Sequence, residues 1–342
     1  MTVGVEEVAG RYARHALVPG WNQASLSNAC VVVVGIGAIG SEVARLLAQA
    51  GVGRLLLCDP DVIEESNLSR GALFGPADVG RPKAEAAAAA VRAQDPAVVV
   101  VPRVADLRHG IGLAELRSAD LVLSCLDSVA DRVALTARCG LVGMGLLDAG
   151  SHPWGGEVRY YPPGGPCFAC GCSPAERALT DWHVACADPP AHAGASGPVS
   201  ALVASWQSVV AVRLLFRLPV PFGVVRLEPA TGEAMRVAVQ ADPDCPCHRA
   251  IDPEAITATS LTTAATVADL LALAAPGEQV LTWYPVPSHD QLAPAAFGAL
   301  DPRRTLAELG IPPREILTVV RPPAGVRYLE LGTEVSRCRT QT

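Results

Sequence analysis

The stretch VVVVGIGAIGSEVARLLAQAG, residues 31–51, constrains the fold of this chain more than any other feature. A valine run, typical of a buried β-strand, leads into Gly35, Gly37 and Gly40 and then into an Ala/Leu-rich helix pattern. Glycines between a strand and a helix let the backbone approach a phosphate, which the positive end of the helix attracts. The stretch therefore predicts the start of a nucleotide-binding fold.

Strands alternate with helices over the first half of the chain. We expect strands at 31–34, 53–61, 98–104 and 121–127, and an alanine-rich helix over 82–93. Parallel strands need such crossover helices, so the alternation predicts an α/β fold with a doubly wound, mostly parallel sheet.

The pattern changes from Gly143 onward, where antiparallel strands and cysteine-rich turns follow. A strong helix pattern, SALVASWQSVVAVRLLF, precedes a hairpin with its turn at Ala230–Gly232. We divide the chain into a nucleotide-binding domain, residues 10–250, and a small C-terminal α/β module, residues 255–342. In the module we expect helices over 264–274 and 303–309, and strands over 279–283, 316–320 and 326–331.

Composition excludes several classes of partner. The net charge is -7, the pI is near 5.5, and no dense basic run occurs, which argues against nucleic acid. We expect no signal peptide and no membrane span, because no uninterrupted apolar segment reaches about 18 residues. A cytoplasmic location follows, and there the paired cysteines among the 11 indicate metal binding instead of disulfides.

An acid lies 19 residues beyond Gly40, at Asp59, where it can bind a ribose hydroxyl. NAD and ATP sites share this arrangement, so the motif does not separate them. A triphosphate, unlike a nicotinamide, needs several positive charges around it. The polar loop and helix start after the second strand supply Asn67, Arg70, Arg81 and Lys83.

Asp127 follows a buried strand, at the edge of the sheet where α/β proteins bind ligands. A carboxylate there suits Mg²⁺ held together with phosphate oxygens. The competing interpretations are a solvated helix start for Lys83 and a helix cap for Asp127. Together the set favours ATP with Mg²⁺ over NAD, and an NAD-dependent oxidoreductase is the least favoured alternative.

The motifs RYARH, VGIGAIG, GVGRLLLCDPD, NLSR, DVGRPK and CLDS occur in an order and spacing that resembles a known family. They are similar to the ubiquitin-activating-type adenylyltransferases, above all the bacterial MoeB and ThiF proteins. The resemblance covers about residues 10 to 250. It departs from the family at Ala38, where these proteins usually carry glycine, and at CLDS, which replaces a common CTDN.

The resemblance implies a role for each of these residues. Arg14 would reach across a homodimer interface to the partner's ATP, and Asp59 would bind the ribose. Asn67, Arg70 and Lys83 would bind the triphosphate, and Asp127 would bind Mg²⁺. The family attaches AMP to a C-terminal glycine carboxylate and releases pyrophosphate. A carboxylate is already a nucleophile at neutral pH, so this reaction needs no general base.

The paired cysteines predict a structural zinc site. Cys167 and Cys170 form a CxxC motif, and CPCH lies more than seventy residues downstream. The family's tetrathiolate site favours Cys245 and Cys247 as the second pair. Spacing also permits Cys245 with His248, and Cys172 is a spare thiol nearby.

The step after adenylation stays open at this point. Cys186 resembles in position a cysteine in the crossover loop of ThiF-like proteins, and it is either an acyl carrier or a spectator. The remaining thiols at Cys30, Cys58, Cys125 and Cys139 fit core positions, and Trp206 fits the core or a dimer interface.

The expected substrate is a sulfur-carrier or ubiquitin-like protein ending in Gly-Gly. One alternative is a peptide or small carboxylate activated for amide or P–N bond formation. Another is a non-catalytic, peptide-binding partner subunit. The C-terminal module contains Cys338 as its one cysteine, in a polar tail, so we assign it no sulfurtransferase role.

Overall fold

The computed structural model describes residues 10–178, 194–282, 296–321 and 325–333. They form two sheets, of which the larger has eight strands in the order β3-β2-β1-β4-β5-β6-β7-β8. Five strands are parallel: β1 (Cys30–Val34), β2 (Arg54–Cys58), β3 (Val99–Arg103), β4 (Leu121–Ser124) and β5 (Leu146–His152). Three antiparallel strands extend the sheet: β6 (Gly155–Tyr161), β7 (Gly223–Glu228) and β8 (Glu233–Val237).

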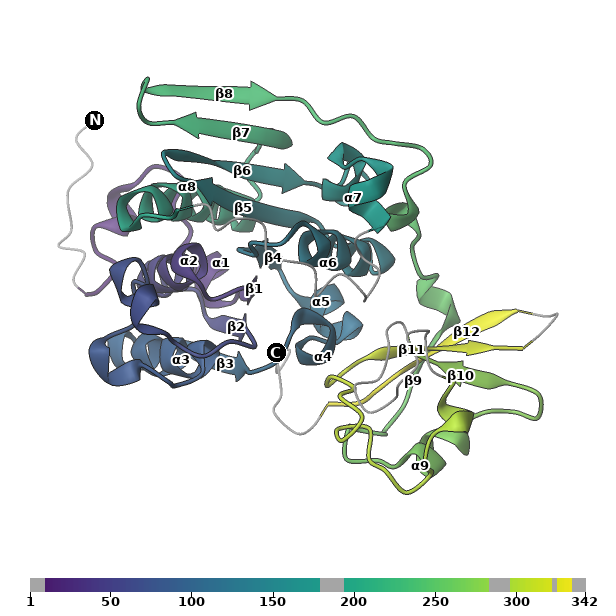
Figure 1. The fold of residues 1–342 in the computed structure, drawn as a ribbon. Helices are drawn as coiled ribbons and strands as arrows, with labels where there is room; N and C mark the ends of the chain where they lie inside the picture. Colours follow the sequence, from purple (N-terminus) through teal and green to yellow (C-terminus); the bar gives the residue numbers. More distant parts are fainter. Residues whose placement is uncertain (1–9, 179–193, 283–295, 322–324, 334–342) are drawn as a thin grey trace, which may run out of the picture.

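Helices cover both faces of the parallel half, as Figure 1 shows. One core cluster joins the sheet to α1 (Gln23–Ser27), α2 (Ala38–Ala50), α3 (Lys83–Gln94) and α8 (Gly197–Leu215). The other joins it to α4 (Leu107–Gly110), α5 (Leu113–Ser118) and α6 (Val129–Leu141). The expected doubly wound α/β class is confirmed. A short helix, α7 (Pro174–Ala178), follows the first cysteine motif.

Helix α8 has 19 residues and a mean hydropathy of 1.4, so it is long and apolar enough to span a membrane. It packs against α2 and β5, with Val203, Ala204 and Ala211 fully buried, and is a core helix of this fold. Trp206 on the same helix is 39% exposed, so of the two positions expected for it the core is wrong, and the dimer interface stays a prediction.

The smaller sheet belongs to the C-terminal module and has the order β10-β11-β12-β9. Its own apolar core includes the fully buried Phe297. The helix α9 (Val267–Leu271) is shorter than expected. The strands are β9 (Ile256–Ala258), which the sequence did not predict, β10 (Gln279–Leu281), β11 (Ile316–Val320) and β12 (Val326–Glu330).

Residues 303–309 form turns, and the helix expected there is wrong. The backbone N–H groups of Leu306 and Ala307 donate to the carbonyls of Ala265 and Thr263, so they are not available to a helix. Tertiary pairing has overridden a good local helix pattern.

The module is fastened to the larger domain by a buried ion pair. Arg138 of α6 lies 2.8 Å from Glu315, and the two side chains are 7% and 0% exposed. The approach is close, because a Cβ added to Gly112 would come within 2.1 Å of the Pro313 carbonyl oxygen. Ile316 of the module packs into the same core cluster as α5 and α6.

Candidate functional site

The glycine loop after β1 meets the loop after β4 at the carboxyl edge of the sheet. Gly35 has φ +85°, and a Cβ there would come within 2.7 Å of the Cys125 carbonyl oxygen. A Cβ on Gly40 would lie 1.9 Å from the Gly35 carbonyl oxygen. Since β2 and β4 flank β1 on opposite sides, this meeting point is the topological switch of the sheet, where α/β folds bind ligands.

A cavity of about 210 Å³ opens between the start of α2, the polar loop after β2 and the start of α8. Ala38, the first residue of α2, lines it together with Arg70. The hydroxyl of Ser41 accepts a hydrogen bond from the Ala72 N–H at 3.1 Å and so ties α2 to the loop that carries Arg70. The complete lining is Ala38, Glu42, Leu68, Ser69, Arg70, Gly71, Ala72, Gly197 and Ala201.

Asp59 lies at the end of β2 and is 5% exposed. Its carboxylate accepts hydrogen bonds from the N–H groups of Ile36, at 2.6 Å, and Asp61, at 2.8 Å. Burial raises the pKa of the Asp59 carboxyl, and these two hydrogen bonds oppose the rise. In this structure Asp59 therefore holds the glycine loop against the end of β2.

The positive residues of the polar loop have different surroundings. Arg70 lines the cavity and donates to the Ser66 carbonyl at 2.8 Å. Lys83 pairs with Asp61 at 2.8 Å, and its side chain is 13% exposed. Arg81 is exposed and pairs with Asp78 at 2.5 Å. Asn67 accepts a hydrogen bond from the Glu64 N–H at 3.1 Å and shapes the loop.

Asp61 is a residue that sequence reasoning missed, although CDPD places it two positions after Asp59. It forms an ion pair with the Lys83 ammonium near the end of β2.

Asp127 is exposed in the loop after β4, and the helix-cap interpretation of this residue does not hold. The N-cap of α6 is Ser128, whose hydroxyl accepts a hydrogen bond from the Asp131 N–H at 3.0 Å. The Asp127 carboxylate therefore lies at the carboxyl edge of the sheet and does not cap α6.

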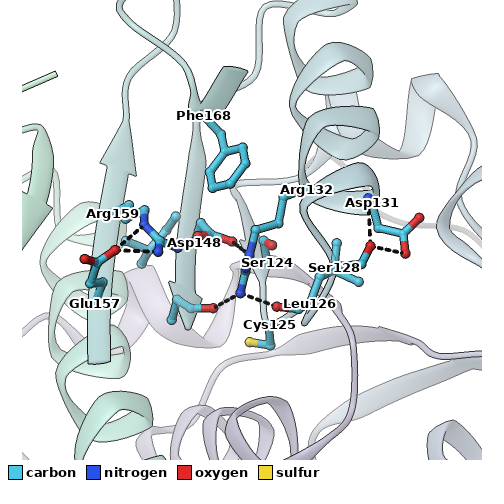
Figure 2. Close-up of polar contacts among 12 residues, drawn as sticks. Ser124, Cys125, Leu126, Ser128, Asp131, Arg132, Asp148, Glu157, Arg159 and Phe168 are labelled. Carbon is cyan, nitrogen blue, oxygen red and sulfur yellow. Dashed lines mark hydrogen bonds and ion pairs between the residues drawn. The ribbon is translucent and has the colours of Figure 1, made fainter. Parts of the chain in front are cut away.

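Behind this loop lies a buried polar cluster that the sequence did not reveal, drawn in Figure 2. Arg132 of α6 lies 3.1 Å from Asp148 of β5, which is fully buried. Arg159 of β6 forms an ion pair with the other oxygen of Asp148. Both guanidinium groups lie over the ring of Phe168, at 5.9 Å and 5.6 Å from its centroid.

Arg14 lies at the start of a short 3-10 helix and is exposed. The segment around it is anchored to α3, because the Tyr12 hydroxyl lies 3.1 Å from Asp95 and Arg11 forms an ion pair with the same carboxylate. His15 stacks on Tyr12 with centroids 5.7 Å apart. These contacts leave Arg14 on the surface of the protomer.

Four side chains from the two cysteine motifs converge near the end of β6. The ligand atoms of Cys167, Cys170, Cys245 and His248 all lie within 4.8 Å of one another. Cys167 Sγ is 3.6 Å from both other sulfurs, and Cys170 Sγ is 3.3 Å from His248 Nε2. This set contains His248, the alternative fourth ligand, in place of Cys247, which is buried beside it. Such a cluster is typical of a zinc site.

Several described thiols outside the cluster have raised pKa values. Burial raises the pKa of the Cys58 and Cys125 thiols well above the usual range, and that of Cys139 to about 12. Cys58 and Cys139 occupy core positions, as expected, whereas Cys30 and Cys125 are half-buried. Cys186 lies outside the described residues.

The doubly wound sheet with a glycine loop at its switch point, and the cysteine–histidine cluster on its antiparallel half, define an E1-like fold. The chain belongs to the ThiF family, whose model matches residues 11–247. The match leaves the C-terminal module outside the family's shared region.

Individual relatives agree with this membership. The chain is 30% identical over 242 residues to the molybdopterin-synthase adenylyltransferase of Escherichia coli K12, covering 69% of this chain and 94% of that protein. It is 41% identical over 164 residues to mouse adenylyltransferase and sulfurtransferase MOCS3, covering 47% of this chain. That match spans only 36% of the mouse protein's length. The fold is similar to that of Escherichia coli MccB with ATP, with a TM-score of 0.59 at 21% identity, covering 71% of this chain and 75% of that chain.

Proposed function

We propose that this protein is an ATP- and Mg²⁺-dependent adenylyltransferase that activates a C-terminal carboxylate. The preferred substrate is a sulfur-carrier or ubiquitin-like protein ending in Gly-Gly, activated for sulfur delivery in cofactor or secondary-metabolite biosynthesis. The observation that carries the proposal is the cavity between the first turn of α2, which follows the glycine loop, and the loop that carries Arg70. The sequence similarity of the chain to adenylyltransferases of other organisms supports the same class of enzyme.

The reaction follows from charge and position. An oxygen of the substrate carboxylate attacks the α-phosphorus of ATP, the bond from that phosphorus to the bridging oxygen breaks, and pyrophosphate leaves. Arg70, Lys83 and Asn67 would bind the triphosphate, Asp59 the ribose, and Gly35, Gly37 and Gly40 would admit the phosphates to the helix start. Bound at Asp127, Mg²⁺ would neutralise phosphate charge. The barrier is charge repulsion, which these groups lower without a general base.

Zinc would be held by Cys167, Cys170, Cys245 and His248 in a structural role. Tetrahedral zinc with bonds of about 2.0–2.3 Å places its ligand atoms about 3.3–3.8 Å apart. The separations of 3.6 Å and 3.3 Å in the cluster fit this geometry. The metal would pin CPCH, after the β7–β8 hairpin, to the turn that follows β6.

Metal content tests this ligand set. We expect about one zinc per chain in the purified protein, lost in His248→Ala and retained in Cys247→Ser. Retention in the histidine variant with loss in the serine variant would restore Cys247 as the fourth ligand.

Two further roles rest on the family resemblance. Arg14 would complete the ATP site of a partner protomer in a cytoplasmic homodimer, and its exposed position is compatible with this. Cys186 would be either an acyl carrier or a spectator. A mass adduct that disappears in Cys186→Ser would support the carrier role, and full turnover by that variant would remove it.

Calorimetric titration with ATP and Mg²⁺, against NAD⁺ and NADH, tests the nucleotide. We expect ATP binding that weakens in Asp127→Ala and in Lys83→Ala. NAD binding with indifference to ATP would refute the proposal.

The substrate is tested by pyrophosphate exchange with a Gly-Gly carrier and with the same carrier lacking its terminal glycine. Exchange that depends on the glycine supports the carrier. Equal exchange with both would favour the alternative of a peptide or small carboxylate activated for amide or P–N bond formation. No AMP formation with any carboxylate would favour a non-catalytic, peptide-binding partner subunit.

A further inference from the structure

The loop that carries Asp127 is short and is anchored at both ends. At its start, the N–H of Cys125 donates to the Val34 carbonyl at 2.8 Å and continues the pairing of β4 with β1. At its end, Ser128 caps α6. Between these anchors lies Leu126, whose carbonyl belongs to the same peptide unit as the Asp127 nitrogen. Whatever holds that carbonyl therefore fixes the plane of the peptide unit through which Asp127 is attached.

Arg132 holds the Leu126 carbonyl. One of its terminal nitrogens donates to that oxygen and also lies 3.3 Å from the Ala149 carbonyl on β5. Figure 2 shows the guanidinium reaching from α6 into the gap between the Leu126 loop and β5. Arg132 is 9% exposed, so these contacts are shielded from water.

Asp148 fixes the guanidinium in this position. It is fully buried, accepts from Arg132 Nε at 3.1 Å, and stands opposite Ser124 in the pairing of β4 with β5. Gly150 leaves room for the group, because a Cβ there would lie 2.8 Å from the Arg132 terminal nitrogen. The same carboxylate also pairs with Arg159. The charge of Arg132 is thus matched within the protein, and its distinctive contact is the Leu126 carbonyl.

We infer that Arg132, held by Asp148, is a positioning residue that orients the Asp127 carboxylate toward Mg²⁺ by binding the Leu126 carbonyl. The inference rests on the proposed function of Asp127. A guanidinium can bridge a carboxylate and two carbonyls in one plane, whereas a lysine ammonium is a point charge on a flexible stem. Arg132→Lys therefore keeps the buried positive charge beside Asp148 and loses the bridge.

The test measures ATP binding by calorimetry over a series of Mg²⁺ concentrations, which requires no carboxylate substrate. We expect Arg132→Lys to raise the Mg²⁺ concentration for half-maximal ATP binding by roughly 10- to 100-fold, the usual effect of removing an outer-sphere partner. ATP binding in EDTA should be the same as in the wild type. Asp148→Asn keeps the side-chain shape but weakens the hold on Arg132, so it should shift the Mg²⁺ dependence in the same direction. This second variant keeps the inference testable if Arg132→Lys does not fold.

A double variant separates positioning from general damage. Because Arg132 acts through Asp127, Arg132→Lys should add nothing to the Mg²⁺ dependence of Asp127→Ala. The matched control is Arg108→Met, which removes an ion pair to Asp131, 2.9 Å long, on the same first turn of α6. We expect this control to keep the wild-type Mg²⁺ dependence.

Three results would overturn the inference. One is wild-type Mg²⁺ dependence in Arg132→Lys and Asp148→Asn, another is additive effects in the double variant, and the third is an equal shift in the Arg108 control. Failure of the wild-type protein itself to bind ATP with Mg²⁺ would refute the proposed function as well, so the two failures are distinguishable.

Discussion

The ion pair between Arg138 and Glu315 allows a quantitative test of how the C-terminal module is fastened. Arg138→Met removes the cation and keeps most of the apolar stem. The partner carboxylate then remains at 0% exposure, with the Ile316 N–H, 3.0 Å away, among its remaining contacts. Burial already raises the pKa of Glu315, and Arg138 is the chief group that opposes this rise. The variant therefore leaves a buried charge without its counter-ion.

Breaking a buried pair in this way costs about 3–5 kcal/mol. With a urea dependence of about 3 kcal/mol per molar, the unfolding midpoint should fall by about 1–1.7 M. The assay is urea unfolding followed by far-UV circular dichroism. Arg138→Met with Glu315→Leu should recover much of the loss, because neither charge is then stranded.

The matched control is Arg303→Met, which removes an exposed pair with Asp301 in the same module. We expect its midpoint to equal that of the wild type. If Arg138→Met also left the midpoint unchanged, the pair would not be desolvated, and the account of how the module is fastened would be refuted.

Three further predictions concern the nucleotide site and the module. Lys83→Ala should weaken ATP binding about tenfold in calorimetry, while Asp61→Ala should leave ATP binding unchanged. Both variants should change the free energy of unfolding by under about 1 kcal/mol, since the ion pair between the two residues is partly solvated. Gly37→Ala should keep wild-type stability, because a Cβ at this position meets nothing within 4 Å. The variant should weaken ATP binding about tenfold, because the phosphates are expected to approach this backbone. Unchanged ATP binding would show that the phosphates bind elsewhere. Hydrogen bonding to Arg327 lowers the pKa of Glu278 to about 2, from 4.5. The ionised Glu278 therefore stabilises the fold above pH 4.5, and this stabilisation is lost as the pH falls toward 2. The difference in unfolding midpoint between wild type and Glu278→Gln should vanish over that range. A difference that stays constant with pH would contradict the assignment.

The strand–glycine–helix pattern predicted the parallel half of the sheet well, because strand, turn and helix signals there agree with one another. It placed Asp59 and Asp127 at the ends of β2 and β4, although the strands are shorter than expected and both acids lie in loops. Cysteine spacing predicted the metal cluster but left its fourth ligand open, since that choice depends on how CPCH turns in space.

The contacts that the sequence did not reveal are long-range. Arg132 and Asp148 are 16 positions apart, and nothing in their local pattern marks them as partners. Arg138 and Glu315 are separated by 177 positions, and they lie in α6 of the larger domain and just before β11 of the module. The same holds for the turns at 303–309, where backbone groups bond to residues about forty positions earlier. Charged residues inside a helix pattern are ordinarily solvent-facing, so only the packed fold identifies these as buried.

Helix α6 connects the candidate site, the cysteine cluster and the C-terminal module. Its first turn follows Asp127, its last turn holds Glu315 of the module, and Gly140 lies so close to the second cysteine motif that a Cβ would come within 2.1 Å of the Cys247 carbonyl oxygen. Helix α6 thus contacts three separate parts of the molecule. Replacing the C-terminal module by another would therefore require new side chains on α6 as well, because the module is fastened through this helix.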